Sequence, residues 1–287
     1  MHIMILGLGK SGTTALLYKI AAGLPGSKAF SGGKPGKHNG TYKNAVFKHT
    51  YEARKGKDFD LYRCHMDNVR YDRKIWIARD PRDVAVSRML YRWHRGVAGH
   101  KQQFRAHLDR VLEKEQDPLA IPFYEICLHT GHDDWPMSLQ KIIAEEQTRY
   151  AEMTSFVKTL GDDWLLFTFE DMVDQNFTLL EKYLGFKVKE DTEVPESTGK
   201  AKVIRKKSYG DWRHWFTPQD IDIFKPLYSP YMDLIGYDSD NWSLAKKPHI
   251  DPAYSSEYMQ RLPARVAQDT VRRVKDQTLR LFRKQVG

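Results

Sequence analysis

The sequence has few cysteines and no long apolar run. Only Cys64 and Cys127 occur among 287 residues, too few for a disulfide framework, so a reducing compartment is expected. The first ten residues, MHIMILGLGK, contain too short an apolar stretch for a signal-peptide core or a membrane span. We therefore expect a cytoplasmic protein.

Acidic residues are also in deficit. The chain has 46 Lys and Arg against 37 Asp and Glu, a formal net charge of +9. Such a balance favours an anionic partner, which includes a phosphorylated cofactor, a nucleic acid, an acidic glycan and a lipid headgroup. Charge alone does not choose among these partners.

What the sequence does contain is an alternation of short apolar segments with helical patterns. Helical spacing begins at Thr13 and again after Pro81, Ser138 and Asn176. Strands interleaved with helices predict the α/β class, with a central parallel sheet flanked by helices. The expected strands are residues 3–8, 45–47, 59–62, 74–78 and 164–169.

The length favours a single domain over residues 1–250, with residues 96–160 as a largely helical insertion. Residues 23–40 and 195–212 have the composition of long loops. Residues 251–287 are expected to form a basic helical C-terminal extension that packs on the domain or contacts an anionic membrane surface. Its cations are Arg261, Arg265, Arg272, Arg273, Lys275, Arg280, Arg283 and Lys284.

The first motif is the glycine loop from Gly7 to Thr14, between an expected strand and an expected helix. Backbone N–H groups and the helix dipole favour an anion at such a place. Gly7 and Gly12 keep the spacing of an ATP-binding loop, but Lys10 lies inside the loop and Thr13 follows where that motif has lysine. The loop predicts a phosphate site other than a standard ATP site, and a simple capped turn stays open as the alternative.

The second motif runs from Arg79 to Ser87. An apolar strand ends at Arg79, and Pro81 marks the first turn of a helix. Arg79 is thus expected at the carboxyl edge of the sheet, where open α/β sheets bind ligands, with Ser87 about two turns further on. The alternative is a surface ion pair between Arg79 and Asp80 or Asp83.

Three further segments carry candidate residues. A predicted strand leads to His65, whose ordinary pKa suits a general base. Arg205, Lys206 and Lys207 form a dense basic cluster, followed by Gly-Asp-Trp and Phe-Thr. Phe169 follows another predicted strand and precedes Glu-Asp-Met.

In this order, the motifs resemble those of the family of sulfotransferases that use 3′-phosphoadenosine 5′-phosphosulfate (PAPS). The resemblance covers residues 3–217 and implies a P-loop-like sulfotransferase architecture. Ala15, at a position where many members have Trp, and Lys207, where the family has Gly, depart from the family pattern. His and Asp side chains that are adjacent in a short loop, as in the run His129-Thr-Gly-His-Asp-Asp, are common on protein surfaces, so no metal site is expected.

The resemblance implies PAPS as donor, adenosine 3′,5′-bisphosphate as product and no required metal. It implies that His65 deprotonates the acceptor while Lys10 stabilises the departing phosphate, with Ser87 as the third residue of the catalytic set. The implied cofactor-binding residues are Lys10, Ser11, Gly12, Thr13, Thr14, Arg79, Ser87, Phe169, Arg205, Lys206 and Lys207.

The sequence does not identify the acceptor, which has a hydroxyl or amine and belongs to a glycan, a lipid or a smaller molecule. Two rival functions stay open: a P-loop small-molecule kinase that uses ATP and magnesium, and a nucleic-acid-binding protein that uses the basic extension. If the chain is a sulfotransferase, no nucleic-acid partner is expected. The oligomeric state is open.

Overall fold

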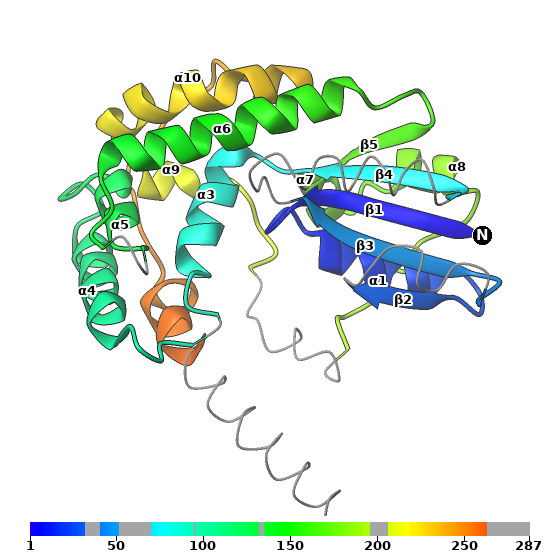
Figure 1. Ribbon diagram of the computed structural model, residues 1–287, viewed down its shortest axis with the longest axis horizontal. Coiled ribbons are helices and arrows are strands. Elements are labelled where there is room, and N and C mark those ends of the chain that lie inside the picture. Colours follow the sequence, from blue (N-terminus) through cyan, green and yellow to red (C-terminus); the bar gives the residue numbers. More distant parts are fainter. Residues whose placement is uncertain (32–40, 52–69, 95, 132–134, 196–205, 263–287) are drawn as a thin grey trace, which may run out of the picture. The chain divides into compact units, whose positions relative to one another are not determined.

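A computed structural model describes residues 1–31, 41–51, 70–94, 96–131, 135–195 and 206–262 (Figure 1). The chain divides into two compact units. The first unit comprises Met1–Ala85, Ile143–Trp212 and Ile221–Ser243; the second comprises Val86–Ile142, Arg213–Asp220 and Leu244–Gly287.

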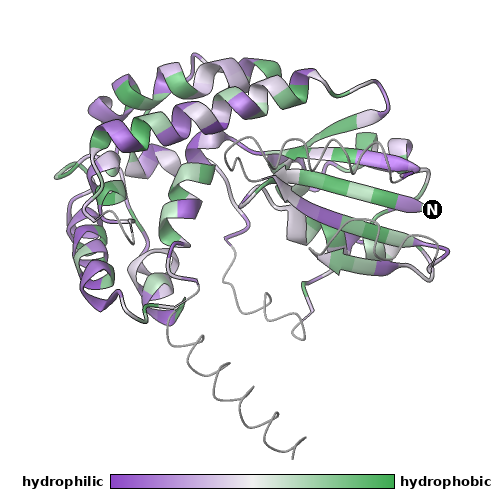
Figure 2. Cartoon of the chain, viewed as in Figure 1, coloured by the Kyte–Doolittle hydropathy of each residue, from purple (hydrophilic) through white to green (hydrophobic). Residues whose placement is uncertain are grey.

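The first unit is built on a five-stranded sheet of order β2-β3-β1-β4-β5 in which all neighbouring strands are parallel. This confirms the predicted α/β class. The central strands read as apolar runs because helices cover them on both faces, and hydrophobic colour accordingly runs along most of β1 in Figure 2. The strands are β1 (His2–Leu8), β2 (Lys28–Ser31), β3 (Ala45–Tyr51), β4 (Arg73–Ala78) and β5 (Trp164–Thr168).

Strand β2 corrects the expectation that residues 23–40 form only a loop. Lys28–Ser31 pair in parallel with β3, from Lys28↔Ala45 to Ser31↔Lys48. The backbone groups of β2 find their hydrogen-bond partners in β3. The Gly- and Pro-rich composition around β2 gives no sign of this pairing. The predicted strand at residues 59–62 lies outside the described residues.

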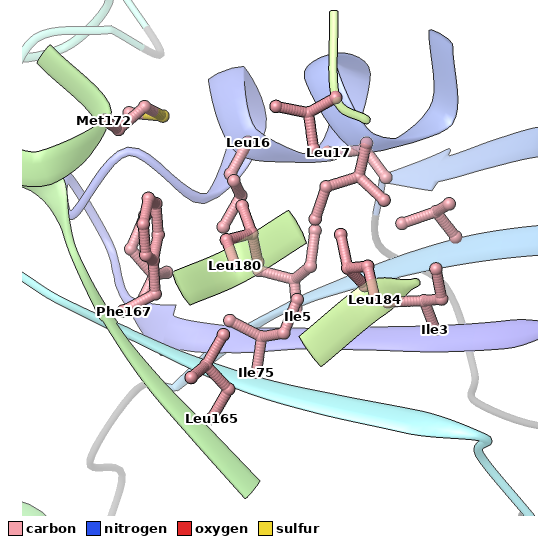
Figure 3. Close-up of a cluster of buried hydrophobic side chains, with 14 of the residues drawn as sticks. Ile3, Ile5, Leu16, Leu17, Ile75, Leu165, Phe167, Met172, Leu180 and Leu184 are labelled. Atoms are coloured by element: carbon pink, nitrogen blue, oxygen red, sulfur yellow. The ribbon is translucent and has the colours of Figure 1, made fainter. Parts of the chain in front are cut away.

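One face of the sheet packs against three helices: α1 (Thr13–Gly23), α7 (Phe169–Val173) and α8 (Thr178–Leu184). Figure 3 shows this core, in which apolar side chains from strands and helices meet. Burial of such side chains contributes about 1.5–3 kcal/mol each. The core includes Ile3, Ile5, Leu16, Leu17, Ile75, Leu165, Phe167, Met172, Leu180 and Leu184.

The opposite face packs against α6 (Leu139–Lys158) and α10 (Pro218–Leu234). Because side chains alternate along a strand, Trp76 lies on this face, with its ring 5.5 Å from that of Phe156. Its indole N–H donates to the Tyr231 hydroxyl at 3.2 Å. Tyr150 of α6 lies 4.6 Å from Tyr228 of α10, ring centre to ring centre, so the two helices pack side by side (Figure 1).

The second unit is helical in its described residues. It contains α4 (Lys101–Gln116), α5 (Phe123–Leu128), a 3-10 turn at Pro252–Tyr254 and a helix over residues 256–262. The buried carboxylate of Asp220 accepts the backbone N–H groups of Phe123 and Tyr124 at 2.8 and 2.9 Å, which fixes the start of α5. Four helices have residues in both units: α3 (Pro81–Leu90), α6, α9 (Trp212–Trp215) and α10.

Among the helices that the structure describes, none combines the length and apolar character that crossing a membrane requires.

Gly7→Ala should destabilise the first unit strongly, because the added Cβ would lie 2.5 Å from the Ile77 carbonyl oxygen. We expect a loss of roughly 2–3 kcal/mol in the free energy of unfolding, measured by urea denaturation. Gly9→Ala is the matched control in the same loop, since its nearest neighbour would be Thr50 Cγ2 at 3.6 Å. Equal stability of the two variants would contradict the close approach of β1 and β4 at Gly7.

Candidate functional site

The candidate site lies at the carboxyl edge of the sheet, where a glycine loop joins β1 to α1. The backbone is left-handed at Lys10 (φ 79°) and Gly12 (φ 89°). A Cβ on Gly12 would lie 2.6 Å from the Phe169 ring and 2.8 Å from Met172, so the position requires glycine. No side chain caps α1 and its first turn contains no acidic residue, so its N-terminal N–H groups suit an anion.

The side chains of the loop are partly engaged within the protein. Ser11 is 1% exposed, and its hydroxyl and its N–H both donate to the Leu8 carbonyl, at 2.8 and 3.1 Å. To donate to a phosphate, the Ser11 hydroxyl has to rotate away from Leu8. Thr13 is buried and Thr14 is half-buried.

Lys48 of β3 is a site residue that the sequence analysis missed. It is 9% exposed, and its ammonium donates to Thr14 Oγ1 at 3.0 Å. A lysine is rarely so buried unless its ammonium has a partner. The signal in the sequence was a single lysine inside the apolar run AVFKHTY, and the structure shows that this run is the strand beside β1.

Arg79 emerges from β4 directly over the loop. One of its Nη atoms donates to the Lys10 carbonyl at 3.0 Å, and its guanidinium carbon lies 4.1 Å from the centre of the Phe169 ring. Its Nε–H is buried and has no hydrogen-bond partner among the residues that the structure describes. Arg79 also lines a space too narrow for a water molecule. A buried donor without a partner in the described part of the chain is a group that an anion at this edge could satisfy.

Phe169 therefore contacts the loop and Arg79. The ring is 8% exposed and caps both Gly12 and the guanidinium. Cation–π contact of this kind contributes about 0.5–2 kcal/mol. The implied role of Phe169 in cofactor binding stays a prediction.

The acidic residues after Arg79 do not form the alternative surface ion pairs. Asp80 pairs with Arg82 at 2.7 Å, and both side chains are at most 10% exposed. Asp83 is 1% exposed and accepts the backbone N–H groups of Gly210 and Trp212. Burial raises the pKa of Asp83 to about 6, although the Arg79 charge and the two N–H donors act in the opposite direction.

The late basic motif is thus joined to the second motif. Lys206 and Lys207 are exposed, and Lys206 pairs with Asp211 at 2.5 Å. The Tyr209 hydroxyl donates to Asp174 at 2.8 Å. Ser87 is a half-buried residue of α3. The predicted residues Arg205 and His65 lie outside the described residues.

Glu170 is a second acid at this edge that the sequence analysis did not select. Its carboxylate accepts a hydrogen bond from the Tyr237 hydroxyl and a long one, 3.4 Å, from the Asp80 N–H. Burial raises its pKa to about 7, and the Tyr237 hydrogen bond opposes that rise. The site therefore holds a carboxyl group that titrates near neutral pH.

Among the residues that the structure describes, no three His, Cys, Asp or Glu side chains gather as they would around a metal ion. Comparison of the chain with models of known protein families and with curated protein sequences gave no match.

Glu170→Gln should change the pH dependence of stability. The folded pKa, about 7, lies above the ordinary 4.5, so the contribution of Glu170 is complete below pH 4.5 and is lost as the pH rises through 7. Glutamine keeps an acceptor for Tyr237 and does not ionise. We expect the wild type to lose roughly 2–3 kcal/mol relative to the variant between pH 4.5 and 8 in urea titrations. Parallel pH profiles would show that Glu170 does not titrate in this range.

Proposed function

We propose that the chain is a sulfotransferase that moves the sulfuryl group of PAPS to a hydroxyl or amine of an acceptor. The observation that carries the proposal is the meeting of the glycine loop, Arg79 and the late basic segment at one edge of the sheet, through the Arg79–Lys10 hydrogen bond and the contacts of Asp83 with Gly210 and Trp212. These are the segments that carry the resemblance to the sulfotransferase family, and residues 79 and 210 are far apart in the sequence.

The proposed donor has two separate phosphate groups, which matches two separate groups of donors. The loop from Gly9 to Thr14, with Lys48, would hold the 5′-phosphosulfate. Arg79, with the late basic segment, would hold the 3′-phosphate. Arg79 supplies a planar fork of N–H donors, and one of them is buried without a partner among the described residues.

In the proposed reaction the acceptor oxygen or nitrogen attacks sulfur in line with the bridging oxygen of PAPS. The new bond to sulfur forms as the sulfur–oxygen bond to the 5′-phosphate breaks, and the electron pair stays on the phosphate. His65 takes the acceptor proton, and Lys10 stabilises the charge that develops on the leaving phosphate. The products are the sulfated acceptor and adenosine 3′,5′-bisphosphate.

Arg79→Ala should abolish binding of adenosine 3′,5′-bisphosphate. In the wild type, the bisphosphate at about 100 times its dissociation constant adds roughly 2.7 kcal/mol of stability, a shift of several degrees in Tm. Arg73→Ala is a matched control at the opposite end of β4: Arg73 also donates to a backbone carbonyl and lies over an aromatic ring, that of Tyr183. Arg73→Ala should keep the shift.

The same thermal titration separates the rival functions. Stabilisation of the wild type by ATP with magnesium, without stabilisation by the bisphosphate, would contradict the proposal and favour a P-loop kinase. A steep salt dependence of binding to DNA or RNA would favour the nucleic-acid alternative.

His65→Ala should lower turnover of PAPS by about 100-fold or more while the bisphosphate still binds, because only proton transfer is removed. Release of the bisphosphate from PAPS, in the presence of acceptors found by screening, measures turnover. His49→Ala is the comparison, since His49 is a buried residue of β3 next to Lys48. Full turnover of His65→Ala with loss in His49→Ala would reassign the base.

A further inference from the structure

Asp83 connects two segments that are distant in the sequence. Its two carboxylate oxygens are used separately: Oδ2 accepts the Gly210 N–H at 2.6 Å and Oδ1 accepts the Trp212 N–H at 3.1 Å. The side chain is buried, and Asp83 is the third residue of α3. Both acceptor positions of a carboxylate are therefore needed at this place, since each N–H faces a different oxygen.

The packing around Trp212 fixes the same junction. The Arg82 guanidinium carbon lies 4.0 Å from the centre of the Trp212 ring and 4.7 Å from that of Trp242. Arg82 also donates to the Asn241 carbonyl at 2.5 Å. At its Trp212 end the segment 206–212 is thus anchored to α3, whereas Lys206 and Lys207 are exposed.

We propose that Asp83 is a positioning residue: its carboxylate ties the segment 206–212 to the start of α3, so that the two lysines of the segment act on the same anion as Arg79. This inference rests on the proposed function for the identity of the anion, a 3′-phosphate. The attachment of the segment 206–212 to α3 by Asp83, called the tie below, rests on the two hydrogen bonds alone. Asp83 does not touch the anion, because both of its oxygens face backbone N–H groups and like charges would repel.

The tie depends on ionisation of Asp83. The charged groups that face it are Arg79, which favours the carboxylate, and Asp80, which opposes it and is paired with Arg82; Asp211 is paired with Lys206. Burial places the pKa of Asp83 at about 6. Above this pH both oxygens accept. Below it the proton occupies one oxygen, and one of the two N–H groups loses its acceptor.

Asp83→Asn tests the tie directly. The amide has nearly the shape of the carboxyl group, but its nitrogen cannot accept, so one of the two N–H groups faces another donor. We expect amide hydrogen exchange of Gly210 and Trp212 to accelerate about tenfold or more, and the Kd for adenosine 3′,5′-bisphosphate to rise about tenfold. Asp174→Asn is the control, because exposed Asp174 contacts the described part of the same segment through the Tyr209 hydroxyl and not through its backbone N–H groups. It should leave both measurements unchanged.

Amide exchange tests the tie, and the Kd for the bisphosphate tests its role in binding. Unchanged exchange in Asp83→Asn would overturn the tie, and faster exchange with unchanged Kd would overturn its role in binding. If the wild type does not bind the bisphosphate, the proposed function fails, and the role of Asp83 in binding fails with it, whereas exchange still decides the tie.

The wild type alone provides a test that does not depend on the folding of a variant. After correction for the intrinsic pH dependence of exchange, protection of Gly210 and Trp212 should fall as the pH drops from 7 to 5. The bisphosphate itself gains protons near pH 6. Its Kd is therefore measured for the wild type and for Asp83→Asn at each pH. The ratio of the variant's Kd to that of the wild type should fall towards one below pH 6. Constant protection across this range would overturn the pH dependence of the tie.

Discussion

The arrangement of the candidate site depends on the guanidinium of Arg79. It donates to the Lys10 carbonyl in the loop after β1 and stacks on Phe169 after β5, while its own backbone continues β4. One side chain thus joins three strand ends. Parallel pairing of β1 with β4 and of β4 with β5 makes this contact geometrically possible, since it brings the carboxyl ends of the three strands to one edge.

Two acidic side chains, Asp83 and Glu170, lie near this cation, and burial makes their ionised forms less favourable. Asp83 and Glu170 both have raised pKa values, with burial as the largest cause. Each is held by hydrogen bonds, Asp83 by two backbone N–H groups and Glu170 by the Tyr237 hydroxyl. The two acids are therefore held within the protein at this edge of the sheet, where the loop N–H groups, Lys48 and Arg79 supply the positive charge of the proposed anion site.

The sequence predicted the parts of the fold that local patterns encode. The apolar runs at β1 and β4, the helix that starts at Thr13 and the helix that starts at Pro81 were all recognised from their periodicity and punctuation. Strand β2 was missed because its hydrogen bonds come from β3 and not from its own composition. The spacing of apolar residues indicates which face of a helix or strand is buried, but it does not indicate which other element covers that face.

Some residues of the candidate site could be selected from the sequence, but their contacts could not. The loop and Arg79 were selected from the sequence, yet Lys48 was missed because a lysine within an apolar run gives no information on the partner of its ammonium, which is Thr14. Asp83 was considered only as an alternative surface partner of Arg79, because its partners, Gly210 and Trp212, are backbone groups in a distant segment. Such pairings follow from topology, which a single sequence does not specify.

The most direct test of the central claim is a crystal structure of the protein with adenosine 3′,5′-bisphosphate. We predict that the 5′-phosphate lies against the N–H groups from Gly9 to Thr14 and that the 3′-phosphate accepts from the Arg79 guanidinium, including its Nε–H. A bisphosphate bound away from this edge, or a 3′-phosphate exposed to solvent without contact to Arg79, would contradict the account.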